Sequence, residues 1–153
     1  MEKIKVFGAP ASPYTHKMIS ILRYRHIAYE VFMGDAPGRL NRLDGIEPPK
    51  PILLPTLLLK DDNGELKATT DTTPIIRRFE NEYADRKLLP EDPALSFINY
   101  LLEDFGDEWV TKYMFHYRWY FDEDADNAST ILPLGDLAVN LSDDFLKEAK
   151  KYI

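Results

Sequence analysis

The chain has 153 residues, of which 44% are hydrophobic and 29% charged, so it is long enough to bury a core and has neither a disordered nor a low-complexity composition. Its formal net charge of −7 argues against nucleic acid or an anionic membrane as a partner, because such binding depends on a basic face. The chain has no cysteine, which excludes disulfides, thiolate metal ligands and a dithiol redox couple of its own.

The amino terminus becomes polar and charged at once, at Glu2 and Lys3, instead of entering an apolar signal core. No apolar run approaches the roughly 20 residues that a membrane-spanning helix needs. We therefore expect a soluble cytoplasmic protein with no membrane partner.

The start of the chain predicts a strand, a loop, a helix and a second strand. Residues 4–7 alternate apolar and charged side chains before a Gly-Ala-Pro turn. Ser12 followed by Pro13 is an N-cap signature, and apolar residues at helical spacing continue the helix to about residue 25. Residues 27–33 are rich in β-branched and aromatic side chains, and a right-handed crossover would lay them parallel to the first strand.

The next part of the chain predicts an irregular segment and then a hairpin. Residues 34–51 carry Gly and Pro repeatedly, so we expect a mobile segment with no more than a short helix. Residues 53–59 form an apolar run interrupted by a proline, and an Asp-Asn-Gly turn at residues 62–64 joins this run to residues 65–70.

Thr73 and Pro74 repeat the cap signature, and apolar residues at helical spacing predict a helix from there to Tyr83. The predicted order is therefore β-α-β followed by β-β-α. This order favours an α/β fold with a mixed four-stranded sheet.

A second, helical region is predicted after a linker that ends at Asp92 and Pro93, which again form a cap signature. Helical spacing then continues to about Trp119, which predicts one long amphipathic helix. The acidic stretch at residues 122–126 is interpreted as a solvated loop, and residues 142–151 as a last helix.

Four short motifs resemble those of cytosolic glutathione transferases. Residues 12–17, Ser-Pro-Tyr-Thr-His-Lys, are similar to the active-site turn that several classes write as Ser-Pro-aromatic-x-x-basic. Residues 27–30 resemble the family's entry into its second strand, and residues 54–57, Leu-Pro-Thr-Leu, resemble its hydrophobic-Pro-x-Leu segment with a cis proline. Asp71 and Thr72 resemble its Glu/Asp-Ser pair, and the match runs in the family's order over residues 4–93.

The resemblance implies a thioredoxin-like glutathione-binding domain at residues 1–87. Residues 93–153 would then be the start of the family's helical second domain, which is usually larger. We expect the uncovered apolar faces of an incomplete helical domain to be buried by self-association, so a homodimer is predicted.

Ser12 is the predicted catalytic residue under this resemblance. A free thiol with a pKa near 8.5 is mostly protonated at neutral pH, so the chemistry needs a group that stabilises the thiolate of glutathione. A hydroxyl at a helix N-terminus can donate a hydrogen bond where the helix dipole also favours negative charge. From the residues alone, an ordinary N-cap is the favoured interpretation of Ser12.

Four further residues are predicted to bind glutathione. The resemblance implies that the backbone of Leu54, beside a cis Pro55, pairs with the cysteinyl unit, whereas the sequence alone favours a trans proline. It also implies that Asp71 meets the amine of the γ-glutamyl group and that Thr72 meets its carboxylate. The alternative for Asp71 and Thr72 is a capping cluster at the start of a helix.

Other candidate residues have open alternatives. Lys50 or Arg42 could meet the glycine carboxylate of glutathione, as a basic residue in this segment often does in the family. Tyr14 could be a second hydroxyl donor in the site or a packed aromatic residue. Residues 116–119, His-Tyr-Arg-Trp, could line an electrophile pocket or pack in a core. The three histidines lack metal-ligand spacing, so no metal is predicted.

Two functions follow from this interpretation. The first is a glutathione transferase that uses glutathione as co-substrate and attacks a small electrophile. The second is a non-catalytic scaffold module of the same fold, which resembles transferase-like domains in protein assemblies. A glutaredoxin-like reductase would need a cysteine at the position of Ser12.

Overall fold

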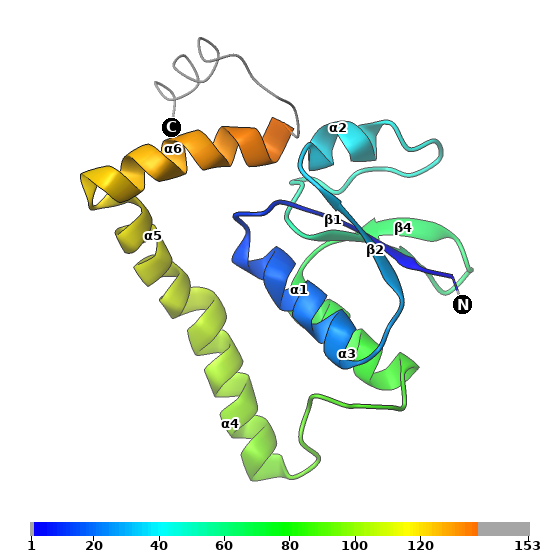
Figure 1. The fold of residues 1–153 in the computed structure, drawn as a ribbon. Helices are drawn as coiled ribbons and strands as arrows, with labels where there is room; N and C mark the ends of the chain where they lie inside the picture. Colours follow the sequence, from blue (N-terminus) through cyan, green and yellow to red (C-terminus); the bar gives the residue numbers. More distant parts are fainter. Residues whose placement is uncertain (1, 138–153) are drawn as a thin grey trace.

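The structure is a computed structural model that describes residues 2–137, and its centre is a four-stranded sheet of order β2-β1-β3-β4 (Figure 1). The strand β1 (Ile4–Gly8) pairs in parallel with β2 (Tyr29–Met33) and antiparallel with β3 (Thr56–Lys60). The strand β4 (Leu66–Thr69) pairs antiparallel with β3 at the edge. This topology is thioredoxin-like and confirms the predicted mixed four-stranded sheet.

Successive strand residues point to opposite faces of the sheet, so β1 and β3 supply two cores. Val6 and Leu57 lie in the core beneath α1 (Pro13–Tyr24) and α3 (Thr72–Glu82). The other buried members of this core are Met18, Leu22, Ile27, Leu59, Ile75, Ile76 and Phe79. Phe7 and Leu58 point the other way, against Ala36 and Leu40 of the short helix α2 (Ala36–Asn41).

The start of α3 differs from the prediction. The N-cap is Asp71, whose carboxylate accepts a hydrogen bond from the Thr73 amide at 3.2 Å, and the helix begins at Thr72. Pro74 then lies within the first turn, where backbone amides have no partner inside the helix, so the missing N–H of proline costs no helical hydrogen bond.

A buried ion pair joins both helices of this core to the segment that leads into the helical part. The guanidinium of Arg25 contacts the carboxylate of Glu80, and both residues are buried. Arg25 also donates to the carbonyl of Tyr83 at 2.6 Å. Glu80 accepts from the amides of Leu88 and Leu89 at 3.0 and 3.3 Å, which fixes the path of the chain after α3.

The helical part begins with α4 (Pro93–Asp104), and the carboxylate of its N-cap Asp92 accepts from two backbone amides. A π-helical turn, η1 (Phe105–Val110), continues directly into α5 (Thr111–Trp119). The three form one long helical run in Figure 1, which agrees with the predicted long helix except for the π-helical turn.

The loop predicted at residues 122–126 is wrong, because these residues form the first turns of α6 (Asp122–Leu137). Three acidic residues lie in its first turn, where negative charge is favoured by the helix dipole. The helix predicted at residues 142–151 lies outside the described residues. Of the helices in residues 2–137, none combines the length and the apolar character needed to cross a membrane.

We predict that Glu80→Ala lowers the free energy of unfolding by about 3–5 kcal/mol, because the substitution leaves the buried guanidinium of Arg25 unpaired. Urea denaturation followed by circular dichroism measures this loss. The matched control is Glu82→Ala on the same helix, since Glu82 forms an exposed ion pair with Arg78 and its removal should cost no more than about 0.5 kcal/mol. Equal losses in the two variants would contradict the role given to the buried pair.

Candidate functional site

The carboxyl ends of β1 and β4 lie beside the amino end of β3 at one edge of the sheet. The predicted site residues come to this edge because they adjoin these strand ends. Phe7 of β1 lies opposite Thr56 of β3, and Leu57 of β3 lies opposite Thr69 of β4. Because both pairs are antiparallel, the carboxyl ends of β1 and β4 lie beside the amino end of β3. The chain continues from these ends into the residues predicted from sequence, namely Ser12, Leu54, Pro55, Asp71 and Thr72.

Ser12 is the N-cap of α1, and its hydroxyl oxygen accepts from the Thr15 amide at 3.2 Å. Its own amide donates to the carbonyl of Ala9 at 3.1 Å, which closes the turn between β1 and α1. A hydroxyl can accept and donate at the same time, so this cap leaves the Ser12 proton available for a further hydrogen bond. The half-buried Ser12 can therefore act both as a cap and as a donor.

Gly8 allows β1 to approach α1 closely at this turn. A Cβ atom at Gly8 would lie 2.4 Å from a methyl carbon of Thr15, which is fully buried. The Thr15 hydroxyl accepts from the Ala9 amide at 3.4 Å. No role for Thr15 was predicted from sequence, although a small residue at the end of the strand and a hydroxyl in the first helical turn are the signals for such a contact.

The Leu54–Pro55 peptide bond is cis, as is Lys50–Pro51. Pro55 is fully buried, whereas Leu54 is half-buried and lines a cavity of ≈260 Å³ together with Gly8, Ala9 and Gly34. This cavity lies between the ends of β1 and β2 and the segment before β3. Leu54 is the one predicted site residue that lines this cavity, and Ser12, Asp71 and Thr72 lie outside its lining.

Asp71 and Thr72 lie at the N-terminus of α3. Asp71 has a φ of 73°, and one of its carboxylate oxygens caps the helix while the side chain remains exposed. Thr72 is buried. An exposed carboxylate beside unpaired helix amides offers an acceptor for an amine and donors for a carboxylate within one turn.

A half-buried cluster attaches the helical part to this edge of the sheet. The ammonium group of Lys17 donates to Glu103 at 3.0 Å and to Asp107 at 2.6 Å. The Thr73 hydroxyl donates to the same Glu103 oxygen at 3.0 Å. Thr73 follows Asp71 and Thr72 directly, so this cluster connects the helix N-terminus of the candidate site to α4 and η1.

Burial disfavours the charged form of Lys17, but the hydrogen bonds from its ammonium group to Asp107 and Glu103 outweigh burial and raise the Lys17 pKa above its ordinary value of 10.5. The folded state therefore holds this proton more tightly than the unfolded state does. The stabilisation is complete below the pKa of an unfolded lysine and is lost as the pH rises through the folded pKa.

Tyr14 also contacts the π-helical turn, because its hydroxyl donates to the backbone carbonyl of Asp107 at 2.7 Å. Burial raises the pKa of Tyr14 above its ordinary value of 10.0. The hydroxyl proton of Tyr14 is thus engaged by the protein, whereas that of Ser12 is not used by the N-cap hydrogen bond.

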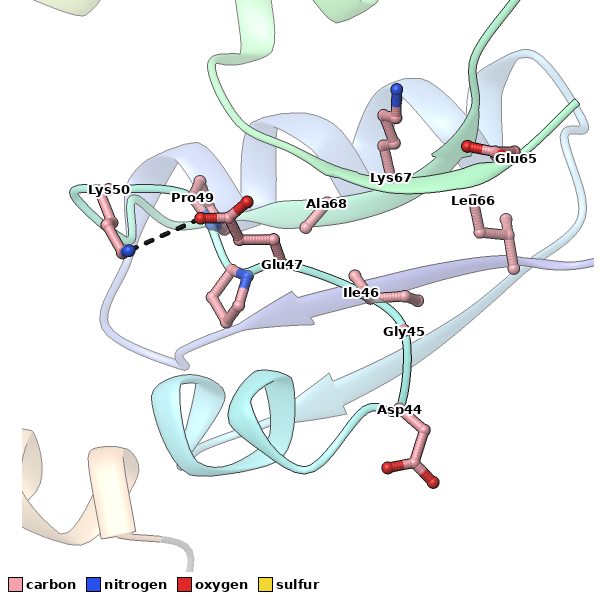
Figure 2. A pocket seen from close by; sticks show the side chains of 11 residues that line it. Asp44, Gly45, Ile46, Glu47, Pro49, Lys50, Glu65, Leu66, Lys67 and Ala68 are labelled. Carbon is pink, nitrogen blue, oxygen red and sulfur yellow. Dashed lines mark ion pairs between the residues drawn. The ribbon is translucent and has the colours of Figure 1, made fainter. Parts of the chain in front are cut away.

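The two basic candidates for the glycine carboxylate each have an acidic partner. Arg42 donates to Asp35 at 2.8 Å, and Lys50 lies 3.5 Å from Glu47, with both members of the second pair exposed. Figure 2 shows Lys50 and Glu47 on the wall of an open cavity of ≈820 Å³ between residues 44–50 and 65–68. This cavity does not include Ser12, so its size does not make it the site of the chemistry.

A further cavity of ≈350 Å³ lies between the turn that joins β1 to α1 and the corner formed by α5 and α6. Tyr117 and Arg118 line it, and Arg118 donates to the carbonyl of Ala11 at 3.2 Å. His116 instead packs against Tyr120, with ring centroids 4.6 Å apart. Two of the four residues 116–119, for which lining an electrophile pocket was one of two predicted roles, therefore line this cavity.

The comparisons with known proteins agree with the fold of the chain. A family model described as "Glutathione S-transferase, N-terminal domain" matches residues 6–87, which is more than half of the chain. The chain therefore belongs to the glutathione S-transferase family. No curated protein sequence matches the chain.

Two solved structures are similar in fold. One is a glutathione S-transferase from Methylobacterium radiotolerans in complex with glutathione sulfonate, which is 20% identical with a TM-score of 0.58 over 98% of this chain and 61% of that one. The other is a Tau class glutathione S-transferase from the mango Mangifera indica, which is 17% identical with a TM-score of 0.54 over 86% of this chain and 60% of that one. The chain thus spans about three fifths of the length of each of these structures.

We predict that Lys17→Met lowers the free energy of unfolding by about 1–3 kcal/mol at neutral pH, because it leaves two half-buried carboxylates without their cation. Urea denaturation at a series of pH values measures the loss. The difference from the wild type should shrink as the pH rises past 10.5 and Lys17 loses its proton in the wild type as well.

The matched control for this variant is Lys60→Met, which removes an exposed ion pair with Glu2 and should cost no more than about 1 kcal/mol. A Lys17→Met loss as small as that of the control, or a loss that grows at high pH, would show that the cluster does not attach the helical part.

Proposed function

We propose that the chain binds glutathione at the sheet edge and that Ser12 stabilises its thiolate for attack on an electrophile. The observation that carries this proposal is the geometry of Ser12, whose hydroxyl accepts from the Thr15 amide and keeps its proton for a ligand. The N-terminus of α1 adds a partial positive charge at the same place.

The other predicted residues take the roles that the family resemblance implies. The Leu54 backbone pairs with the cysteinyl unit beside the cis Pro55, Asp71 accepts from the γ-glutamyl amine, and Thr72 with the α3 N-terminus holds the γ-glutamyl carboxylate. Tyr14 belongs to the same proposed site, but as a residue that packs against Asp107. Residues 1–87 form the glutathione-binding domain in this proposal, and residues 93–153 form the start of the helical one.

The reaction needs no covalent intermediate on the protein. The bound thiol loses its proton to solvent, and the sulfur forms a bond to the electrophilic carbon while the leaving group departs with its bonding electrons. A hydrogen bond and the helix dipole can lower a thiol pKa by about one unit, which corresponds to about 1.4 kcal/mol. Such a shift would turn a minor thiolate population into a substantial one near neutral pH.

Calorimetric titration of glutathione into the chain tests the binding site. Asp71→Ala should weaken binding by about tenfold or more, because the ligand amine loses its carboxylate partner. Ser12→Ala should bind nearly as well as the wild type but raise the pKa of the bound thiol by about one unit, which ultraviolet thiolate absorbance measures.

The controls for this titration are Asp62→Ala in the exposed hairpin turn and Ser20→Ala on the exposed face of α1. Absence of glutathione binding by the folded chain would reject the transferase proposal and favour the non-catalytic scaffold module. The exposed apolar surface of α4 and α5, which a protein partner could cover, supports that second function.

This apolar surface also supports self-association. The helices α4 and α5 and the turn between them have no buried residues, although many of their side chains are large and apolar. More than half of the side-chain surface is exposed at Leu95, Phe97, Tyr100, Leu101, Leu102, Trp109, Tyr113, Phe115 and Tyr117. An apolar area of this extent on a folded chain marks an interface.

We predict a homodimer with twice the 17.7 kDa mass of the chain in light scattering at micromolar concentrations. Leu102→Glu should shift the population towards the monomer, because a carboxylate at a buried interface costs several kcal/mol. Leu53→Glu is the matched control, since Leu53 is similarly exposed but lies in the loop before β3. A monomer at every concentration tested would contradict the prediction.

A further inference from the structure

The cavity at the corner of α5 and α6 lies next to the proposed catalytic residue, because Ala11 lines the cavity and precedes Ser12. Its other walls come from both helices and carry apolar groups, namely Met114, Ala128, Ile131 and Leu132. The volume of ≈350 Å³ lies in the range of pockets that hold small molecules.

Arg118 gives this cavity a fixed positive charge. One of its terminal nitrogens donates to the Ala11 carbonyl at 3.2 Å and contacts the Met114 sulfur at 3.3 Å. Among the side chains that the structure describes, which end at residue 133, no carboxylate forms an ion pair with Arg118. The Nε and the second terminal nitrogen thus keep their protons for another acceptor.

Three arginines in the described part of the chain pair with a carboxylate, a partner that Arg118 lacks there. Arg25, Arg42 and Arg78 each contact a carboxylate of the chain. A guanidinium presents a planar fork of donors that matches the two oxygens of a carboxylate. Arg118 is held at one corner by a backbone carbonyl, so the fork is oriented before a ligand arrives and little side-chain entropy is lost on binding.

We propose that Arg118 makes this cavity select electrophiles that carry a carboxylate. This inference rests on the proposed function, because it takes the bound molecule to be the second substrate of that reaction. The carboxylate binds at the Ala11 side of the cavity, and the apolar body of the electrophile lies against Met114 and α6. The carboxylate thus lies at the end of the cavity that adjoins Ser12, so an electrophilic carbon close to the carboxylate is the one nearest the proposed thiolate.

Asp124 sets a limit on the ligand. Its exposed carboxylate lines the same cavity from the first turns of α6. A second anionic group on that side would be repelled, so the cavity suits an electrophile with one carboxylate. Replacing Asp124 with Asn should therefore strengthen the binding of a monocarboxylate.

The test uses two unreactive probes of nearly equal shape, 3-nitrobenzoate and 3-nitrobenzamide, titrated calorimetrically into the full chain without glutathione. The wild type should bind the carboxylate about tenfold more tightly than the amide, because a charge-assisted hydrogen-bonded pair is worth that ratio. Arg118→Gln should remove this preference while it can still donate to the Ala11 carbonyl. Arg118→Lys should keep part of it, and Asp124→Asn should increase it.

The control is Lys112→Gln, which removes one positive charge from an exposed position of α5 that does not line the cavity. Its preference for the carboxylate should equal that of the wild type. Equal binding of the two probes by the wild type, or an unchanged preference in Arg118→Gln, would overturn the inference.

Because this titration contains no glutathione, its result is independent of the proposed transferase site. Preference for the carboxylate without binding of glutathione would support the anion-selective cavity and reject the transferase proposal. Binding of glutathione without a carboxylate preference would support the transferase proposal and reject the anion-selective cavity.

Discussion

Lys17 holds the helical part of the chain against α1 and the start of α3, and the candidate site depends on that attachment. Its ammonium group extends from α1, in the turn after Ser12, to carboxylates of α4 and η1 at 3.0 and 2.6 Å. The Thr73 hydroxyl joins the same carboxylates from the start of α3. One half-buried cation thus connects the first helical turns of both helices whose N-termini face the proposed glutathione site. The cost of desolvating the lysine is repaid because it has two anionic partners.

The π-helical turn places these groups where a regular helix would not. Within η1, Asp107 supplies a carboxylate to Lys17 and a backbone carbonyl to the Tyr14 hydroxyl. A π-helical turn inserts one extra residue and rotates the side chains that follow, and such turns are common at functional sites. The helix α5 continues directly from this turn, and its Arg118 donates to the carbonyl of Ala11. The attachment at Asp107 and the contact at Arg118 therefore lie on one continuous helical run.

Local signals predicted most of the fold, and contacts between distant residues account for what they missed. The caps at Ser12 and Asp92 mark helix starts because a cap is satisfied within three residues. The acidic stretch of α6 was misassigned, since acidic residues suit both a solvated loop and the first turn of a helix. Lys17 and Asp107 are 90 residues apart, and no periodicity within either helix indicates that they meet. Of the candidate site, the sequence therefore predicted the residues at the strand ends and the segment 116–119, but not the contacts of Lys17 with Glu103 and Asp107.

The position of Ser12 explains how one residue can serve both stability and chemistry. As an N-cap it uses only an oxygen lone pair, so its proton remains available for a second hydrogen bond. A catalytic hydroxyl placed in this way is held in one orientation by the same hydrogen bond that starts the helix. Ala11 belongs to the same turn, and its carbonyl accepts a hydrogen bond from Arg118 one residue before Ser12. A thiolate stabilised at Ser12 and a carboxylate held at Arg118 would then be positioned by adjacent residues of a single turn, so the spacing between nucleophile and electrophile depends on the rigidity of that turn.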